Sequence, residues 1–342
     1  MTVLGVPGVD GQPSTRDQVL AAIEAGRQFI LTTHENPDGD ALGSLVGMHL
    51  LLRALGKDSL MFMSADEFPL PYEYRFIVLD GLVTEPPPDL ADRIIVFLDC
   101  GNIDRNPADA FKGPDARILN LDHHHDNTHF GTVNHVRPDA SCTAEIVWDL
   151  MGALHVEPSL DMAEALYVGL ITDTGRFMYE TTGRRAHEMA AELITAGVDV
   201  HTIYRRLFEG VPQAKLDLLG RGLANLQRYE GGLLSLTHLS KADYAAVGAE
   251  EGYSEGIVDH LRALEGTAVA GLVRDLLTES KAGCRKVSLR AADDRVDVSA
   301  IARAQGGGGH RRAAGFSTEL EWEELVRFLR EAVAEALTPV HG

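Results

Sequence analysis

The chain has 342 residues, 45% of them hydrophobic, with three cysteines and a net charge of -20. This length suits two domains, and the sparse cysteines without a C-x-x-C pair argue against a disulfide framework or a zinc finger. The acidic excess argues against a general electrostatic grip on long nucleic acid. Because no apolar run could span a bilayer and no signal-peptide pattern is present, we expect a cytoplasmic protein without membrane contact.

In the first half, apolar β-prone runs alternate with helical patterns. This alternation predicts an α/β fold with a parallel sheet and helices on both faces. We expect a flexible leader at 1–15 and a first domain at 16–209. The predicted strands are residues 28–33, 59–63, 94–98 and 118–121, and the predicted helix is 40–55.

Helical patterns dominate residues 143–226, and Gly210 and Pro212 mark a boundary. We expect a connecting helix within 210–230, followed by a smaller α/β domain at 231–342. In this domain, strands are predicted at 232–237, 268–273 and 286–290, a glycine run at 306–309 and a final helix at 320–337.

Acidic and histidine residues follow the predicted strands of the first half. His34, Asp38 and Asp40 lie in a tight loop after the first strand, although an Asp-Gly turn with Asp40 capping the next helix would also fit. Asp99 directly follows the strand at 94–98 and could instead be an edge residue. Since the carboxyl ends of parallel strands line one crevice, we expect these side chains to meet there.

The run Asp122-His123-His124-His125 directly follows the strand at 118–121, which makes a solvated loop the weaker interpretation. Asp173 ends an apolar helix, where a carboxylate opposes the helix dipole unless a cation is bound. Oxygen-rich ligands with a minority of imidazole favour Mn²⁺ or Mg²⁺ over structural zinc. The ligands are too many for one ion and suit a pair.

The pattern His34-x-x-x-Asp38-x-Asp40, then Asp99, Asp122-His123-His124 and Asp173 resembles the four-motif signature of DHH phosphoesterases. The segment Gly307-Gly308-Gly309-His310-Arg311-Arg312-Ala313-Ala314-Gly315 is similar to the motif of the DHH-associated C-terminal domain. Together the two motif sets cover nearly the whole chain. Cys100 and His125 depart from the commoner pattern without removing an expected ligand. The layout most resembles bacterial nanoRNases that also act as 3′-phosphoadenosine 5′-phosphate phosphatases.

The resemblance implies two Mn²⁺ ions, with Mg²⁺ possible. One would be held by His34, Asp38 and Asp99, and the other by Asp40, Asp99, His123 and Asp173. Asp122 would orient a neighbouring imidazole, and His124 would contact the scissile phosphate. Substrate phosphate would be bound in the second domain by Arg290, Gly307, Gly308, Gly309, His310 and Arg311.

The implied function is hydrolysis of very short RNA to mononucleotides and of 3′-phosphoadenosine 5′-phosphate to AMP and phosphate. Three alternatives stay open on the sequence alone: a linear or cyclic dinucleotide phosphodiesterase acting on c-di-AMP or pApA, a RecJ-like single-strand exonuclease, and a non-catalytic nucleic-acid-binding protein. Pyrophosphatase activity is disfavoured by the glycine-histidine motif. A homodimer is implied only by resemblance.

Overall fold

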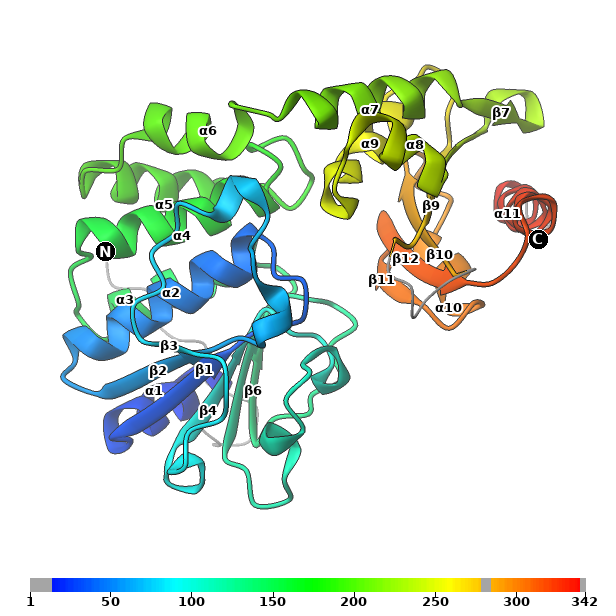
Figure 1. Cartoon of the computed structure of the whole chain (residues 1–342). Helices are drawn as coiled ribbons and strands as arrows, with labels where there is room; N and C mark the ends of the chain where they lie inside the picture. Colours follow the sequence, from blue (N-terminus) through cyan, green and yellow to red (C-terminus); the bar gives the residue numbers. More distant parts are fainter. Residues whose placement is uncertain (1–13, 278–283, 339–342) are drawn as a thin grey trace. The chain divides into compact units, whose positions relative to one another are not determined.

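The computed structural model describes residues 14–277 and 284–338, and its contacts divide the chain into two units, Met1–Glu209 and Gly210–Gly342 (Figure 1). Most of the predicted leader lies outside the described residues. Helix α1 (Thr15–Ala25) begins at the end of that leader, where the Ser14 side chain accepts a hydrogen bond from the Asp17 N–H. None of the described helices is both long and apolar enough to cross a membrane.

The first unit contains a six-stranded sheet in the order β3-β2-β1-β4-β5-β6, with every neighbouring pair parallel. All four strands predicted in this half are confirmed within one residue at either end. The two short edge strands, β3 and β6, were not predicted. The strands are β1 (Gln28–Thr32), β2 (Asp58–Phe62), β3 (Leu82–Val83), β4 (Ile94–Leu98), β5 (Ile118–Asp122) and β6 (Val133–Val136).

The two faces of this sheet are covered differently. On one face, Leu31 and Val96 pack in the core to which the long helices contribute, and Figure 1 shows α2–α5 together on that side. On the other face, Phe97 packs against Phe111, which lies in a short 3-10 turn at Asp109–Lys112. The expectation of helices on both faces is therefore wrong for the described residues. The β4–β5 connection forms two short 3-10 turns, and the buried ring of Phe111 packs against this face of the sheet.

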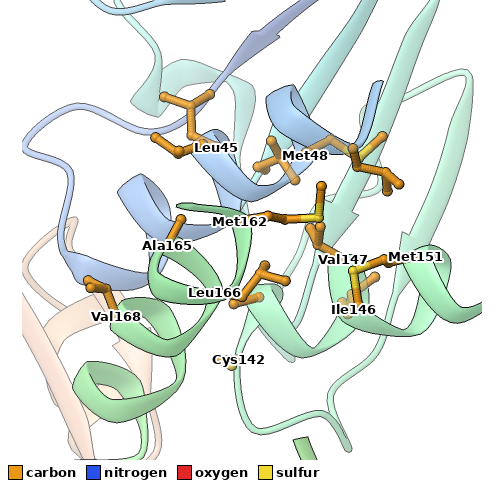
Figure 2. Packing of buried hydrophobic residues seen from close by; sticks show 14 of the residues in the cluster. Leu45, Met48, Cys142, Ile146, Val147, Met151, Met162, Ala165, Leu166 and Val168 are labelled. Atoms are coloured by element: carbon orange, nitrogen blue, oxygen red, sulfur yellow. The ribbon is translucent and has the colours of Figure 1, made fainter. Parts of the chain in front are cut away.

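Helices α2, α3 and α4 pack beside the sheet, and Leu45, Val147 and Leu166 belong to their shared hydrophobic core (Figure 2). A Cβ on Gly43 would lie 2.7 Å from the Gly169 backbone nitrogen, so the crossing of α2 and α4 requires glycine there. The helices are α2 (Gly39–Ala54), α3 (Thr143–Ala153), α4 (Leu160–Asp173), α5 (Arg184–Thr195) and α6 (Val200–Phe208).

The second unit holds a mixed sheet in the order β11-β12-β10-β9-β8-β7, in which only β8 and β9 pair in parallel among the described strands. Helices α7 to α9 pack on one face and α10 and α11 on the other. The elements are α7 (Gln213–Ala224), β7 (Gln227–Tyr229), β8 (Leu234–Leu239), α8 (Lys241–Val247), α9 (Ile257–Arg262), β9 (Val269–Asp275), β10 (Arg285–Ala291), α10 (Val298–Arg303), β11 (Gly308–His310), β12 (Ala313–Thr318) and α11 (Trp322–Leu337).

Helix α7 lies where the connecting helix was expected, and it packs within the second unit. Leu218 is fully buried in the same cluster as Tyr244 and Leu261. The predicted glycine run is partly extended, because Gly308–His310 forms strand β11. The predicted final helix starts at Trp322, two residues later than expected.

Candidate active site

The carboxyl ends of three neighbouring strands and the ends of two helices supply the predicted metal ligands. His34 lies two residues after β1, Asp99 directly follows β4, and Asp122 ends β5. Asp38 is the N-cap of α2, and Asp173 is the last residue of α4. Because β1, β4 and β5 are adjacent and parallel, their ends meet at one edge, as expected for this class of sheet.

The predicted ligands form three groups in which the ligand atoms lie within 4.8 Å of one another. These groups share Asp99 or His123, so they form one continuous cluster. The groups are His34 with Asp38 and Asp99, Asp40 with His123 and Asp173, and Asp99 with His123 and His124. All six predicted ligands, together with His124, are therefore brought together.

Asp99 lies at the centre of this cluster and is only 2% exposed. One of its carboxylate oxygens is 3.6 Å from His34 Nε2, and the other is 3.6 Å from His123 Nε2. Thr143 Oγ1 donates a hydrogen bond of 3.1 Å to the second oxygen. The backbone of Asp99 has φ 56°, a strained conformation for a non-glycine residue that is concentrated at functional sites.

The ring of His34 is oriented by its own loop. Its Nδ1 lies 2.7 Å from the carbonyl oxygen of Glu35, which can only accept, so Nδ1 carries the proton. Nε2 is then left with its lone pair facing Asp99. This is the usual arrangement of a metal-binding imidazole, whose second nitrogen donates to a carbonyl or carboxylate.

Asp40 caps a helix, although not the one that the sequence suggested. Its two carboxylate oxygens accept hydrogen bonds from the backbone N–H groups of Thr143 (2.6 Å) and Ala144 (2.9 Å), at the start of α3. Asp38 instead caps α2, accepting from Asp40 N and Ala41 N at 3.0 Å each. The alternative in which Asp40 caps its own helix is therefore wrong, and each Asp40 oxygen keeps a second lone pair for a cation.

A hydrogen-bonded chain holds His124 in place. Its Nδ1 is 2.7 Å from Asp122 Oδ1, and Asn127 Nδ2 donates to the other oxygen of Asp122 at 2.6 Å. Burial opposes protonation of His124, but the bond and charge of Asp122 prevail and raise its pKa to about 10. Asn127, 8% exposed, was not predicted as a site residue, because an asparagine five residues after Asp122 does not by itself indicate this contact.

The electrostatics of the cluster favour bound cations. Burial, followed by the charges of Asp99 and Asp38, raises the pKa of Asp173 to about 7. Burial and the charges of Asp99 and Asp173 also hold the pKa of Asp40 well above its usual range. The Asp40 carboxylate is buried and that of Asp173 is partly exposed. Carboxylates that repel one another in this way, with imidazoles as their near neighbours, form a donor set that fits divalent metal ions.

Two neighbouring residues of the motifs lie outside this donor set. His125 is exposed and belongs to none of the three groups. Cys100 is fully buried, and burial raises the pKa of its thiol to about 12. A thiol that stays protonated at neutral pH is a poor nucleophile.

In the second unit, the sheet register brings Arg290 and His310 together. Both residues pair with Ala313 on β12, from opposite sides, so their side chains share one face across a small residue. Arg290 Nε lies 3.5 Å from Asp259 Oδ1. Gly309 has φ 132°, and a Cβ there would lie 2.7 Å from Ala314 Cα, so this position requires glycine.

The other predicted substrate-binding residues lie close to this row. A Cβ on Gly307 would overlap the Gly315 carbonyl, while one on Gly308 would meet nothing within 4 Å. Arg311 lies in the turn between β11 and β12, and its guanidinium donates 2.6 Å to the Asp294 carbonyl. Arg311 is therefore not in the row of Arg290 and His310.

Comparisons with known proteins found a matching domain family for each of the two units. Residues 28–170 match the DHH family, N-terminal domain, and residues 241–338 match the DHHA1 domain. The bifunctional oligoribonuclease and PAP phosphatase NrnA of Thermus thermophilus is 33% identical over 326 residues, covering 94% of this chain and 93% of that protein. The Bacillus subtilis protein of the same name is 24% identical, covering 92% and 97%.

Solved structures show the same fold. An exopolyphosphatase-related protein from Bacteroides fragilis aligns with a TM-score of 0.81 at 23% identity, covering 95% of this chain and 96% of that one. RecJ from Thermus thermophilus in complex with Mn²⁺ aligns with a TM-score of 0.56 at 15% identity, covering 95% and 55%. With its ligand cluster, its glycine-histidine strand and these similarities along nearly its full length, the chain belongs to the DHH family.

Proposed function

We propose that this protein hydrolyses phosphoester bonds in very short RNA oligonucleotides, releasing mononucleotides, and converts 3′-phosphoadenosine 5′-phosphate to AMP and phosphate. The observation that carries this proposal is the convergence of six carboxylate and imidazole ligands, with His124, around the buried Asp99. The names of the NrnA relatives that align over nearly the whole chain support the choice of substrates.

Two ions would be held by the cluster. His34, Asp38 and Asp99 would bind one, and Asp40, His123 and Asp173 the other, with Asp99 shared because its two oxygens face different imidazoles. We propose Mn²⁺, with Mg²⁺ as the alternative, from the oxygen-rich donor set. When bound, divalent ions would screen the negative charge of the phosphate and lower the pKa of the attacking water.

The chain's own residues position and protonate the substrate. The Asp122 carboxylate, fixed by Asn127, orients the His124 ring and raises its pKa. His124 would then give its proton to the leaving oxygen as the ester bond breaks. The hydrogen bonds that α3 donates to Asp40 fix this carboxylate before any ligand arrives.

The second unit would bind a terminal phosphate of the substrate. Arg290 and His310 offer donors on one face of the sheet. Gly307, Gly308 and Gly309 would let a phosphate approach the backbone closely, because they carry no Cβ. The Gly307 N–H itself already donates to the Ala302 carbonyl at 2.9 Å. Arg311 would assist from the adjoining turn.

The test is a substrate panel with purified protein and Mn²⁺. We expect fast turnover of a labelled RNA dinucleotide and of 3′-phosphoadenosine 5′-phosphate, and slow turnover of a labelled 24-mer. Asp99→Asn is the control, because asparagine tolerates the left-handed backbone of this position and removes a charged ligand. Rapid loss of the 24-mer would favour a RecJ-like exonuclease, and turnover of c-di-AMP or pApA alone would favour a dinucleotide phosphodiesterase. Substrate binding without turnover would favour a non-catalytic protein.

We also propose that the protein works in the cytoplasm, and that it forms a homodimer through the first unit. Cys100, Cys142 and Cys284 are all free thiols, which agrees with a reducing compartment. Light scattering coupled to size-exclusion chromatography measures the oligomeric state, and a monomer mass of 37.1 kDa would rule out the homodimer.

A further inference from the structure

The first residue of helix α3 forms hydrogen bonds with two of the proposed metal ligands. This residue, Thr143, is fully buried. Its backbone N–H donates a hydrogen bond of 2.6 Å to Asp40, and its hydroxyl donates one of 3.1 Å to Asp99. Asp40 is proposed as a ligand of one ion and Asp99 as a ligand of both, so a single residue contacts ligands of the whole pair.

The start of α3 is fixed by contacts that do not involve the cluster. Glu145 is 4% exposed, and its carboxylate accepts hydrogen bonds from the backbone N–H (3.0 Å) and the hydroxyl (2.7 Å) of Ser141. Cys142, the N-cap, makes no side-chain hydrogen bond to the helix, so the first N–H groups of α3 are left for a carboxylate from elsewhere. The Thr143 side chain therefore reaches Asp99 from a well-supported helix end.

The hydroxyl of Thr143 contacts Asp99 in a different way from the imidazoles around it. His34 Nε2 and His123 Nε2 each lie 3.6 Å from an oxygen of Asp99, and both rings are proposed to bind an ion themselves. The hydroxyl instead makes a direct hydrogen bond to a carboxylate oxygen. Hydrogen bonds of this kind, from a residue behind a ligand, fix the orientation of that ligand in metal sites.

We propose that Thr143 is a positioning residue that couples the two metal sites, because its hydroxyl orients the shared ligand Asp99 while its backbone N–H orients Asp40. Since Asp99 belongs to both sites, a change in its orientation should weaken the binding of both ions. A change confined to Asp40 should weaken only one. The role of Thr143 rests on the pair of ions proposed above and deepens that proposal.

Two substitutions separate the hydroxyl of Thr143 from its packing. Thr143→Val keeps the branched shape and the backbone N–H, and removes the hydrogen bond to Asp99. Thr143→Ser keeps the hydroxyl and removes a buried methyl group. If the hydroxyl orients Asp99, valine should impair metal binding and serine should not. If the side chain only fills space, serine should be the more harmful substitution.

The matched control is Thr237 on β8, in the second unit. It is also fully buried, and its hydroxyl donates a hydrogen bond of 2.6 Å to the carbonyl oxygen of Gly222. Thr237→Val therefore removes a buried hydroxyl and its hydrogen bond from a place without proposed metal ligands. Urea denaturation of the metal-free proteins measures what each substitution costs in stability, apart from its effect on metal binding.

The experiment is a calorimetric titration of the metal-free full chain with Mn²⁺. We expect the unaltered protein to bind two ions, and Thr143→Val to bind both about 10-fold more weakly, as changes behind a metal ligand do. Thr143→Ser and Thr237→Val should bind both ions within about threefold of the unaltered protein, since each keeps the hydrogen bond to Asp99.

Several results of the titration would overturn the coupling. They are unchanged or tighter binding by Thr143→Val, weaker binding of one ion only, and binding of a single ion by the unaltered protein. Loss of Mn²⁺ affinity in Thr143→Ser would overturn it even if Thr143→Val did not fold. The substrates are tested separately: an unaltered protein that shows the expected titrations but cleaves none of the panel would contradict the proposed function and still support the coupling.

Discussion

The position of Asp40 depends on a residue that has no side chain. Gly169 on α4 faces the cluster, and a Cβ there would lie 2.8 Å from Asp40 Oδ1 and 2.7 Å from the Ala144 Cβ. Both contacts are shorter than real Cβ atoms make, so the carboxylate can reach the start of α3 only because position 169 is glycine. A small residue on one helix thus sets the place of a ligand on another.

We predict that Gly169→Ala lowers the free energy of unfolding by about 1–3 kcal/mol, as overpacking in a dense core does. It should also weaken Mn²⁺ binding, because the Asp40 carboxylate must move. Urea denaturation and Mn²⁺ titration measure the two effects. Gly152→Ala is the control, since a Cβ at this position in α3 would meet nothing within 4 Å and should stabilise the helix slightly. Equal effects of the two substitutions would contradict the prediction.

Asn127 gives a second prediction at this scale. Its amide donates to Asp122 and its carbonyl oxygen accepts from Asn120 Nδ2 (3.1 Å) and His129 N (2.7 Å), so it fixes the carboxylate that orients His124. Asn127→Ala is expected to lower kcat about 10-fold to 100-fold with Mn²⁺ content retained, as changes behind a catalytic histidine do. Steady-state kinetics and metal analysis test this, and loss of the metal with the activity would instead show that Asn127 supports the ligand cluster.

At the scale of secondary-structure elements, the sequence correctly predicted those strands and helices that have a clear local pattern of apolar residues. The strands with continuous apolar runs and the helix after His34 lie where they were expected. Strand β6 was missed because Asn134 and His135 interrupt its apolar character, and strand β11 because its glycines resemble a turn. Such strands form because they pair with residues distant in the sequence, and no local sequence pattern indicates this pairing. The same limit applies to Phe111, since a short turn gives no signal that it will cover a sheet.

The site shows the same division. Each predicted metal ligand lies just after a strand, at the start of α2 or at the end of α4, so position in the chain carried its signal. Asn127 was not predicted as a site residue, and the fold brings its amide to Asp122 beside the cluster. The helix that Asp40 caps could not be foreseen either, because the partners of this carboxylate are more than 100 residues away.

Strand β6 and helix α1 are joined by His135, which gives a pH prediction. His135 is 4% exposed, its Nδ1 lies 3.0 Å from Thr15 Oγ1, and burial followed by the charge of Arg137 lowers its pKa to about 4. In the unfolded chain the pKa is near 6.5, so the unfolded state binds the proton first as the pH falls. The contribution of the neutral ring is complete above about pH 6.5 and declines as the pH falls towards 4.

We therefore expect acidification from pH 7.5 to pH 5 to reduce the free energy of unfolding by up to about 2 kcal/mol through this residue. His135→Gln should lack that part of the pH dependence, whatever its stability at pH 7.5. Urea denaturation of both proteins at the two pH values measures the difference. Identical pH dependence in the variant would show that His135 is not the titrating group.

At the scale of the whole molecule, the negative charge is divided unequally. Residues 1–209 contain 15 Lys and Arg against 32 Asp and Glu, whereas residues 210–342 contain 16 against 19. The unit with the ligand cluster therefore attracts divalent cations and repels long polyanions, and the second unit is nearly balanced. This distribution agrees with a preference for short substrates.

The two units also have separate hydrophobic cores, which leads to a prediction about their stabilities. In the first unit the larger core lies between the parallel sheet and its helices and a smaller one lies on the opposite face. In the second unit the core lies on both faces of the mixed sheet. A ligand that binds one folded unit stabilises that unit by mass action, about 2.7 kcal/mol at 100 times its Kd. Since the proposed metal ligands all lie in the first unit, Mn²⁺ should stabilise that unit alone.

Hydrogen exchange measured by mass spectrometry on the full chain can follow each unit separately. With Mn²⁺, we expect slower exchange for amides of α2, α3 and α4 and unchanged exchange for amides of β8, β9 and β10. Asp99→Asn should abolish the difference in the first unit, because the shared ligand loses its charge. Equal protection of both units by Mn²⁺ would mean either that the ions also contact the second unit or that the units unfold together. Repeating the measurement with Arg290→Ala separates these explanations. The protection of the second unit by Mn²⁺ should change in this variant only if the second unit takes part directly in binding.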